Sequence, residues 1–198
     1  PRTLARIASE VGAAADPGAA ETVSVAAWDP ESHELTRLRG RTWVREQAAG
    51  HEYRVTGAGF WQIHRSAPET LVQAVLQGLE IQPGERAADL FAGAGLFTAP
   101  LAAAAGTEGH VLSVEGSPGT SRDARKNLFA LPQVEVVQGR VDRVLRSHEG
   151  RLDAVLLGPP RTGAGRVVVD QISAAAPRAV GYVSCDPATL ARDVALLK

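Results

Sequence analysis

The sequence predicts an α/β fold in which a doubly wound parallel sheet is preceded by a small antiparallel β segment. From Arg86 onward, short apolar runs alternate with amphipathic helical patterns at intervals of roughly 20 to 25 residues, which indicates repeated βα units. Between Glu21 and Val55, short alternating runs are instead separated by turn residues. Doubly wound sheets bind ligands beyond the carboxyl ends of their strands, so we expect the functional site there.

The βα units can be placed from the apolar runs and from the residues that start and stop helices. Strands are expected at 86–90, 110–115, 134–138, 152–157 and 179–184. Helices are expected at about 95–105, 118–130, 140–147, 165–175 and from 187 onward.

The first part of the chain is expected to form an arm and a small β subdomain. Residues 1–20 are rich in Ala, Gly and Pro and show little periodicity, which favours a poorly ordered arm or a short helix followed by a linker. We divide the chain into this N-terminal part, residues 1–56, and a second domain, residues 57–198. Strands of the β subdomain are expected at Thr22–Trp28, Glu34–Leu38, Thr42–Arg45 and Glu52–Val55.

Composition narrows the functional classes. The chain has 198 residues, a formal net charge of −1 and one cysteine, which excludes an intrachain disulfide framework and a four-cysteine metal site and favours a cytoplasmic location. No apolar run approaches the ~20 residues of a membrane span, and no metal is expected. The net charge gives no general attraction to nucleic acid, although a local arginine face is compatible with it. Because the chain opens at Pro1 and stops at Lys198 inside a predicted helix, we expect it to be a piece of a longer protein.

The only cysteine, Cys185, lies in a strand–turn–helix segment. Val180–Val183 is an apolar run suited to a buried strand, and Asp186 is expected to cap the next helix with Pro187 at its first position. Cys185 would then precede a helix N-terminus, where free N–H groups and the helix dipole favour the thiolate. Two interpretations stay open, a nucleophile and a small buried apolar residue.

A glycine-containing loop, Asp89-Leu-Phe-Ala-Gly93-Ala-Gly95, joins the first strand of the second domain to its helix. The glycines allow a ligand to approach the backbone closely, although G-x-G is only part of the dinucleotide fingerprint. Glu115, at the end of the next strand, suits a ribose diol. A nicotinamide cofactor would fit this arrangement, but an acidic residue before the glycines is more typical of S-adenosylmethionine enzymes.

The loop after the fourth strand contains Gly158-Pro159-Pro160-Arg161. Two consecutive prolines predict a rigid, extended lip at the mouth of the cleft. Arg161 offers a planar donor fork for a phosphate or substrate, and a solvated or salt-bridged loop arginine is the alternative.

A helix is expected just after residue 65, with Ser66 and Glu69 forming a capping box. The segment Phe60-Trp-Gln62-Ile-His64 precedes it. A core aromatic pair with a solvated His64 explains this segment without any function, and a place near the ligand is the other interpretation. The apolar stripe of the helix consists of Leu71, Val72, Val75, Leu76 and Leu79.

Together these motifs resemble the RNA uracil-C5 methyltransferases, which make 5-methyluridine in tRNA and ribosomal RNA. The resemblance covers roughly residues 57–198. It is carried by the glycine loop, Glu115, the Gly-Pro-Pro-Arg segment, the Phe60–His64 block, which is similar to Phe-Phe-Gln-Val-Asn in the family, and Ser-Cys185-Asp-Pro-Ala-Thr-Leu-Ala-Arg-Asp. It implies a Rossmann-like fold, S-adenosylmethionine as cofactor and RNA as substrate.

The resemblance also implies roles for individual residues. Cys185 would add to C6 of a uracil, so that C5 accepts the methyl group. Pro159 and Arg161 would contact the substrate. The positions that match or adjoin cofactor contacts are Gln62, Asp89, Phe91, Gly93, Gly95, Leu96, Glu115 and Gly158.

The sequence departs from the family at several positions. Gly158 stands where the family has the aspartate of Asp-Pro-Pro-Arg, Phe91 where a tyrosine is frequent, Leu96 where an asparagine is frequent, and Asp186 where an asparagine is usual. The family's catalytic glutamate would follow the cysteine motif beyond Lys198, and its N-terminal RNA-binding β-barrel has no counterpart in the sequence.

Four hypotheses follow. The leading one is an RNA uracil-C5 methyltransferase. A catalytically silent module that binds cofactor or RNA is the alternative that Gly158 favours. A methyltransferase of exocyclic nitrogens would not need Cys185, and a nicotinamide enzyme leaves both Cys185 and the double proline unexplained.

Overall fold

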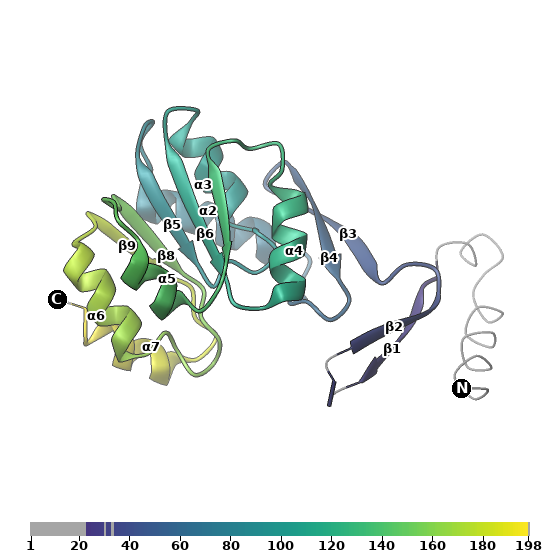
Figure 1. Ribbon diagram of the computed structural model, residues 1–198. Helices are drawn as coiled ribbons and strands as arrows, with labels where there is room; N and C mark the ends of the chain where they lie inside the picture. Colours follow the sequence, from purple (N-terminus) through teal and green to yellow (C-terminus); the bar gives the residue numbers. More distant parts are fainter. Residues whose placement is uncertain (1–22, 30, 33, 198) are drawn as a thin grey trace.

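A five-stranded parallel sheet forms the centre of the computed structural model, which describes residues 23–29, 31–32 and 34–197 (Figure 1). The arm expected at residues 1–20 lies outside these residues. All five predicted strands are present, and two of them are shorter than expected. Their bounds are β5 Arg86–Leu90, β6 His110–Glu115, β7 Val134–Gln138, β8 Ala154–Leu157 and β9 Ala179–Tyr182.

The strand order, β7-β6-β5-β8-β9, places a topological switch point between β5 and β8. The chain runs outward from β5 through β6 to β7 and then returns to the other side of β5, where it forms β8 and β9. Leu90 at the end of β5 pairs in register with Leu157 at the end of β8. The two loops that leave these strands therefore diverge and open the crevice in which doubly wound sheets bind ligands.

Helices cover both faces of the sheet, and alternating strand residues face two cores. Ala154 and Leu156 of β8 pack in the core shared with α2 and α3, whereas Val155 and Leu157 pack in the core shared with α5 and α6. Burial on both faces explains why β8, with the sequence Ala-Val-Leu-Leu, is a continuous apolar run. The helices are α2 Ala67–Leu79, α3 Thr98–Ala105, α4 Pro118–Asn127, α5 Val141–Ser147, α6 Arg166–Ala175 and α7 Pro187–Val194. No helix among the described residues is long and apolar enough to cross a membrane.

The predicted antiparallel β segment is confirmed, and it forms two separate hairpins. β1 Val25–Asp29 pairs with β2 Glu34–Arg39, and β3 Trp43–Ala48 pairs with β4 His51–Thr56. Tyr53 of β4 is buried in the same core as α2 and α3, and its hydroxyl donates to the Leu96 carbonyl at 3.1 Å. The core thus continues across residue 56, where the sequence suggests a division, and the two-part organisation stays a prediction.

The start of α2 corrects one expectation, the capping box. The Ser66 side chain does not cap the helix, and its hydroxyl lies 2.9 Å from His64 Nδ1. Glu69 instead accepts a hydrogen bond from the Ala49 N–H, at 2.6 Å, in the turn between β3 and β4. A long-range contact has replaced the local one, because the hairpin turn presents a backbone donor to this carboxylate. The apolar stripe is confirmed, with Val72, Val75 and Leu79 buried.

Candidate functional site

A pocket of about 210 Å³ opens at the switch point and gathers most of the predicted site residues. The loop after β5 lines one side of it, and the loop after β8 and the turn after β9 line the other. The segment before α2 also contributes. Seven predicted residues line the pocket, namely Gln62, Phe91, Gly93, Leu96, Gly158, Pro159 and Cys185. Asp89, Gly95, Glu115 and Arg161 are not among the lining residues.

The loop after β5 has an unusual backbone conformation. Phe91 has a φ of 64°, which is uncommon for a residue with a side chain, and Gly93 and Gly95 have φ values of 59° and 91°. A Cβ at Gly95 would also lie 2.9 Å from Leu128 Cδ1. A Cβ at Gly93 would meet nothing within 4 Å, so this part of the loop backbone is open to a ligand.

Glu115 fixes the glycine loop from the end of β6. One of its carboxylate oxygens accepts the Gly93 N–H at 2.9 Å, and the other accepts the Ser117 N–H at 2.6 Å. An ionised carboxylate has about four lone-pair positions, so two acceptor positions remain for ligand hydroxyls. Glu115 is therefore placed next to the pocket loop, as the spacing predicts.

Asp89 is buried beneath the loop. Its side chain accepts a hydrogen bond from Thr98 Oγ1 at 2.6 Å, and Thr98 in turn contacts Ser113 Oγ. Burial, with a smaller contribution from the nearby Glu115 carboxylate, raises the pKa of Asp89 to about 7 even though the Thr98 hydrogen bond opposes the shift. In this structure Asp89 anchors the start of α3.

Cys185 is exposed at the edge of the pocket, in the turn between β9 and α7. The predicted cap is confirmed: Asp186 is the N-cap of α7, its side chain accepts the Thr189 N–H at 2.8 Å, and Pro187 begins the helix. Ser184 Oγ accepts the Asp186 N–H at 3.1 Å and closes the turn over Cys185. The thiol is thus presented on a fixed turn just before a helix N-terminus.

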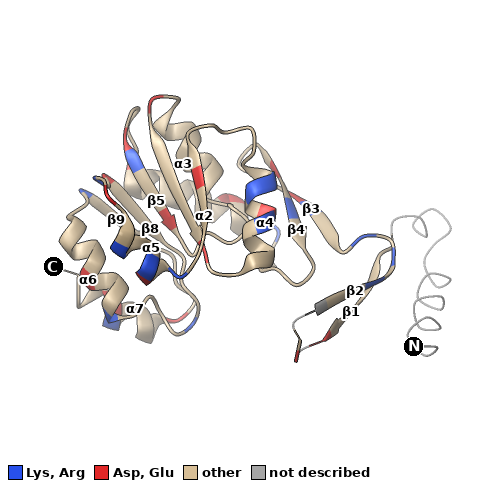
Figure 2. Ribbon diagram, viewed as in Figure 1, with Lys and Arg blue, Asp and Glu red and all other residues tan. Residues whose placement is uncertain are grey.

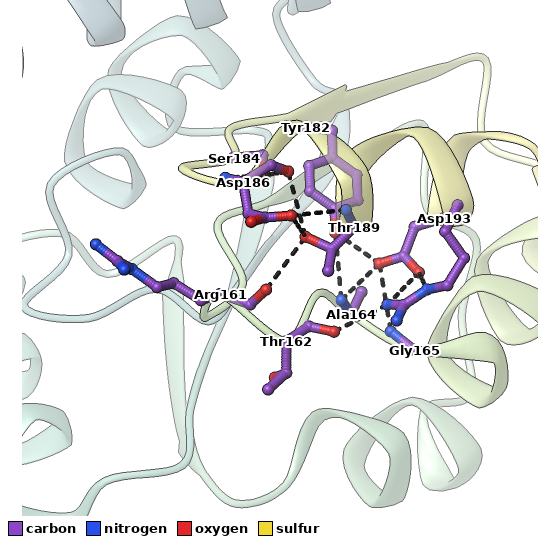
Figure 3. A network of polar contacts seen from close by, with 10 residues as sticks. Arg161, Thr162, Ala164, Gly165, Tyr182, Ser184, Asp186, Thr189 and Asp193 are labelled. Carbon is purple, nitrogen blue, oxygen red and sulfur yellow. Dashed lines mark hydrogen bonds and ion pairs between the residues drawn. The ribbon is translucent and has the colours of Figure 1, made fainter.

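A polar network centred on Asp193 joins α7 to the loop after β8 (Figure 3). Asp193 is fully buried, and its carboxylate accepts hydrogen bonds from the Ala164 N–H and the Tyr182 hydroxyl, each at 2.7 Å. Arg192 donates to the same carboxylate at 2.8 Å. Burial raises the pKa of Asp193, but the hydrogen bonds from Tyr182, Arg192 and Ala164 outweigh it and leave the pKa lowered.

Sequence reasoning missed this network. One feature of the sequence could have indicated a buried Asp193: its spacing from Leu190 and Leu197 places it in a helical stripe where an apolar residue is usual.

The main chain of the loop after β8 is tied to the cysteine helix, whereas the Arg161 side chain is not. Thr189 Oγ1 donates to the Arg161 carbonyl at 3.2 Å. The Arg161 guanidinium is exposed and points away from the network in Figure 3. Its role as a substrate contact remains a prediction. In the described part of the chain, no group of three His, Cys, Asp or Glu residues could hold a metal ion.

Comparison with known proteins identifies the fold as one shared with methyltransferases. Residues 52–143 match the family model "Protein-L-isoaspartate(D-aspartate) O-methyltransferase (PCMT)". The chain superposes with a TM-score of 0.66 and 27% identity on the Pyrococcus abyssi tRNA (uracil-54, C5)-methyltransferase in complex with S-adenosyl-L-homocysteine, over 83% of this chain and 40% of that one. The fold is that of the S-adenosylmethionine-dependent methyltransferases.

Relatives in sequence are named RNA methyltransferases. An uncharacterized RNA methyltransferase of Streptomyces avermitilis is 44% identical over 87% of this chain and 40% of its own length. A 23S rRNA (uracil(1939)-C(5))-methyltransferase of Thiobacillus denitrificans is 41% identical over 70% of this chain and 32% of its own length. The resemblance to the RNA uracil-C5 methyltransferases is therefore confirmed. The chain spans less than half the length of these curated relatives.

The pocket fits S-adenosylmethionine, the cofactor of this class. Phe91, Leu96 and Phe97 supply apolar and aromatic walls of the kind that suit an adenine ring. Glu115 retains acceptor positions for ribose hydroxyls, and the open backbone at Gly93 permits close approach.

Proposed function

We propose that the chain forms the cofactor-binding and cysteine-bearing part of an RNA methyltransferase that modifies C5 of uridine. The observation that carries the proposal is that Cys185 lines the same pocket as the glycine loop after β5. A nucleophile and a cofactor site that share one pocket suit an addition followed by a group transfer.

In the proposed reaction, the Cys185 thiolate adds to C6 of the target uracil and makes C5 nucleophilic. S-adenosylmethionine, when bound, supplies a methyl group on a positively charged sulfur. After C5 has gained the methyl group, a base removes the C5 proton, the C5–C6 double bond re-forms and the Cys185 thiolate leaves. The target base must leave its stack, since C6 is not accessible within one.

Four residues have proposed roles in holding the cofactor. Glu115 would bind the ribose hydroxyls with its remaining acceptor positions, and Gln62, Phe91 and Leu96 would line the cofactor. Pro159 lines the pocket together with Cys185 and would contact the target base. Whether the natural RNA is tRNA or ribosomal RNA depends on surfaces beyond this pocket.

The test uses the intact protein with S-adenosylmethionine and an RNA that contains 5-fluorouridine. Fluorine at C5 cannot leave as a proton, so the covalent adduct accumulates and migrates as a protein–RNA band in denaturing electrophoresis. We expect this band for the wild type and none for Cys185→Ala, because the nucleophile is gone. Cys185 is exposed, so the stability of the variant should be unchanged. An adduct that persists in Cys185→Ala contradicts the proposed mechanism.

A second candidate is a module of the same fold that binds without turnover, and Gly158 is the observation that favours it. The residues that line the pocket include neither a carboxylate nor an imidazole. A Cβ at Gly158 would meet only the Phe91 carbonyl oxygen, at 3.8 Å, so the backbone accepts an aspartate. If the missing carboxylate limits activity, Gly158→Asp should raise methyl transfer to RNA by about tenfold or more.

The matched control is Gly78→Asp on α2, where a Cβ meets nothing within 4 Å and the new carboxylate lies outside the pocket. It should leave the rate unchanged. Active wild type that gains nothing from Gly158→Asp would exclude the silent module.

A further inference from the structure

A basic surface lies on the β3–β4 hairpin and α4, outside the proposed catalytic pocket. We call it the hairpin–α4 surface and define it by Arg41, Arg45, Arg54, Arg122 and Lys126. Residues 34–56 contain five arginines against three glutamates, although the whole chain has a net charge of −1. Figure 2 shows basic residues on β4 and on the neighbouring α4. The positive charge of the chain is therefore unevenly distributed.

On the hairpin, three guanidinium groups gather around one indole ring. Trp43 and Arg45 are two residues apart and so share one face of β3, and Arg45 pairs directly with Arg54 across the strands. Arg41 lies two residues before Trp43, at the entrance to the strand. The guanidinium carbons of Arg41, Arg45 and Arg54 lie 4.8, 5.9 and 4.6 Å from the centre of the Trp43 ring. Like charges directly opposite each other destabilise a hairpin, and cation–π contact with Trp43 offsets part of this cost. The three guanidinium groups are thus held together before any ligand binds.

Helix α4 extends this surface because two of its side chains bind the free edge of β4. Asp123 accepts the Thr56 N–H at 2.7 Å, and Asn127 accepts the Arg54 N–H at 2.8 Å. Lys126, on the same helix, is exposed beside them. Two hollows of about 480 and 250 Å³ both include Arg54 and Lys126 in their walls, so hairpin and helix form one continuous surface.

Acidic partners cancel only part of this charge. Among the described residues, the carboxylates that form ion pairs with the five cations are Glu52, 3.7 Å from Arg45, and Asp123, 3.5 Å from Arg54. The Arg45–Glu52 pair is exposed on both sides and is therefore weak. The surface keeps an excess of positive charge with arginine forks, which suit phosphate oxygens.

The hairpin–α4 surface continues to the catalytic pocket along the chain. Thr56 and Ala58 line the larger hollow, and Phe60 and Trp61 line the pocket. Ala58 and Phe60 are two residues apart, so their Cα atoms are separated by at most about 7 Å. A strand of nucleic acid whose base enters the pocket would pass over this surface with its neighbouring phosphates.

We infer that the hairpin–α4 surface binds the phosphate backbone of the substrate RNA next to the target nucleotide. This inference rests on the proposed function. Phosphate contacts fix the register of a nucleic acid on a protein, and a base outside its stack needs such anchoring near the pocket. The surface also explains how a chain without net positive charge attracts a polyanion.

The test measures binding of the intact protein to a fluorescent RNA hairpin with a uridine in its loop, at several salt concentrations from 50 to 200 mM. Lys126→Glu and Arg45→Glu should each weaken binding roughly five- to tenfold and reduce the slope of log K against log salt by about 1. The matched control is Arg146→Glu, an exposed basic residue in the last turn of α5, just as Lys126 lies in the last turn of α4. It should change the affinity by less than about twofold. Affinity for S-adenosyl-L-homocysteine should be equal in all four proteins.

The outcomes separate this inference from the proposed function. Equal losses in all three variants would indicate a general charge effect and overturn the inference. Wild-type binding that none of the variants weakens would overturn it and leave the proposed function intact. Polyglutamate that displaces the RNA at equal charge concentration would assign the surface to an acidic protein and also overturn the inference. A wild type that binds the cofactor but no RNA would contradict the proposed function itself.

Discussion

The two turns that face each other across the pocket are held in different ways. The turn after β5, residues 91–97, is mostly buried, and its shape comes from backbone conformation: Phe91, Gly93 and Gly95 all have positive φ. The turn after β9 presents an exposed Cys185 and is held by backbone N–H groups that donate to the side chains of Ser184 and Asp186. The glycine-loop side is thus fixed by burial and backbone conformation, and the cysteine side by polar contacts.

This difference suits the two proposed tasks. A site for one constant cofactor can be built into the core, where close packing removes alternative conformations. A nucleophile that must reach an RNA base has to be exposed, so core packing cannot hold it. The Asp193 network is the means by which an exposed turn is tied to buried structure.

The largest effect is expected for Asp193→Ala, which tests the polar side of the comparison. Loss of the buried carboxylate leaves the partly buried Ala164 N–H and Tyr182 hydroxyl without this acceptor, so the free energy of unfolding should fall by about 3 kcal/mol. Since the pKa of Asp193 is lowered in the folded state, its contribution is present above about pH 4 and is lost as the pH falls through the folded-state pKa. Denaturant titrations at pH 7 and below pH 4 measure both effects.

The control for Asp193→Ala is Asp170→Ala on α6. Asp170 is exposed and pairs with Arg166 one turn away, so its loss should cost less than about 0.5 kcal/mol. Similar losses from the two substitutions would show that the polar network does not hold the cysteine side.

Gly95→Ala tests the packed side, with an expected loss of about 2 kcal/mol in the free energy of unfolding. The new Cβ has to occupy a positive φ and lies 2.9 Å from Leu128 Cδ1. Gly84→Ala is the matched control, because its φ of 85° is similar and nothing lies within 4 Å of its Cβ. It should cost about 1 kcal/mol from backbone strain alone. Equal losses of unfolding free energy at Gly95 and Gly84 would show that the contact with Leu128 does not contribute to the cost of Gly95→Ala.

Asp89→Asn tests the buried side of the pocket through the pH dependence of stability, and it has the smallest expected effect. The folded state raises the pKa of Asp89 to about 7, whereas the unfolded chain ionises near the ordinary value of about 4. The folded state therefore binds more protons in this interval, and wild-type stability should decrease as the pH rises towards 7 and level off above it. Relative to Asp89→Asn, we expect a decrease of about 1 kcal/mol between pH 6 and 7, measured by urea unfolding. Parallel pH profiles for the two proteins would contradict the raised pKa.

The features that the sequence by itself determined are local. The βα alternation depends on apolar periodicity, and it placed all five strands of the parallel sheet. The cap of α7 depends on Asp186 and Pro187 alone, and the structure has it as predicted. The carboxyl ends of parallel strands lie at one edge of the sheet, so the sequence could predict which residues gather there. Seven of the eleven predicted site residues line the pocket.

Only the tertiary structure decided which side chains serve which contact. Glu69 binds Ala49 rather than capping its own helix, Asp89 is buried beneath the loop, and the Arg161 side chain points away from the Asp193 network. Asp193 meets Ala164, a residue 29 positions away in the chain. Such contacts depend on strand order and helix docking, which bring distant segments together. A local pattern records the residues that favour an element, and it carries no information on which distant group that element will meet.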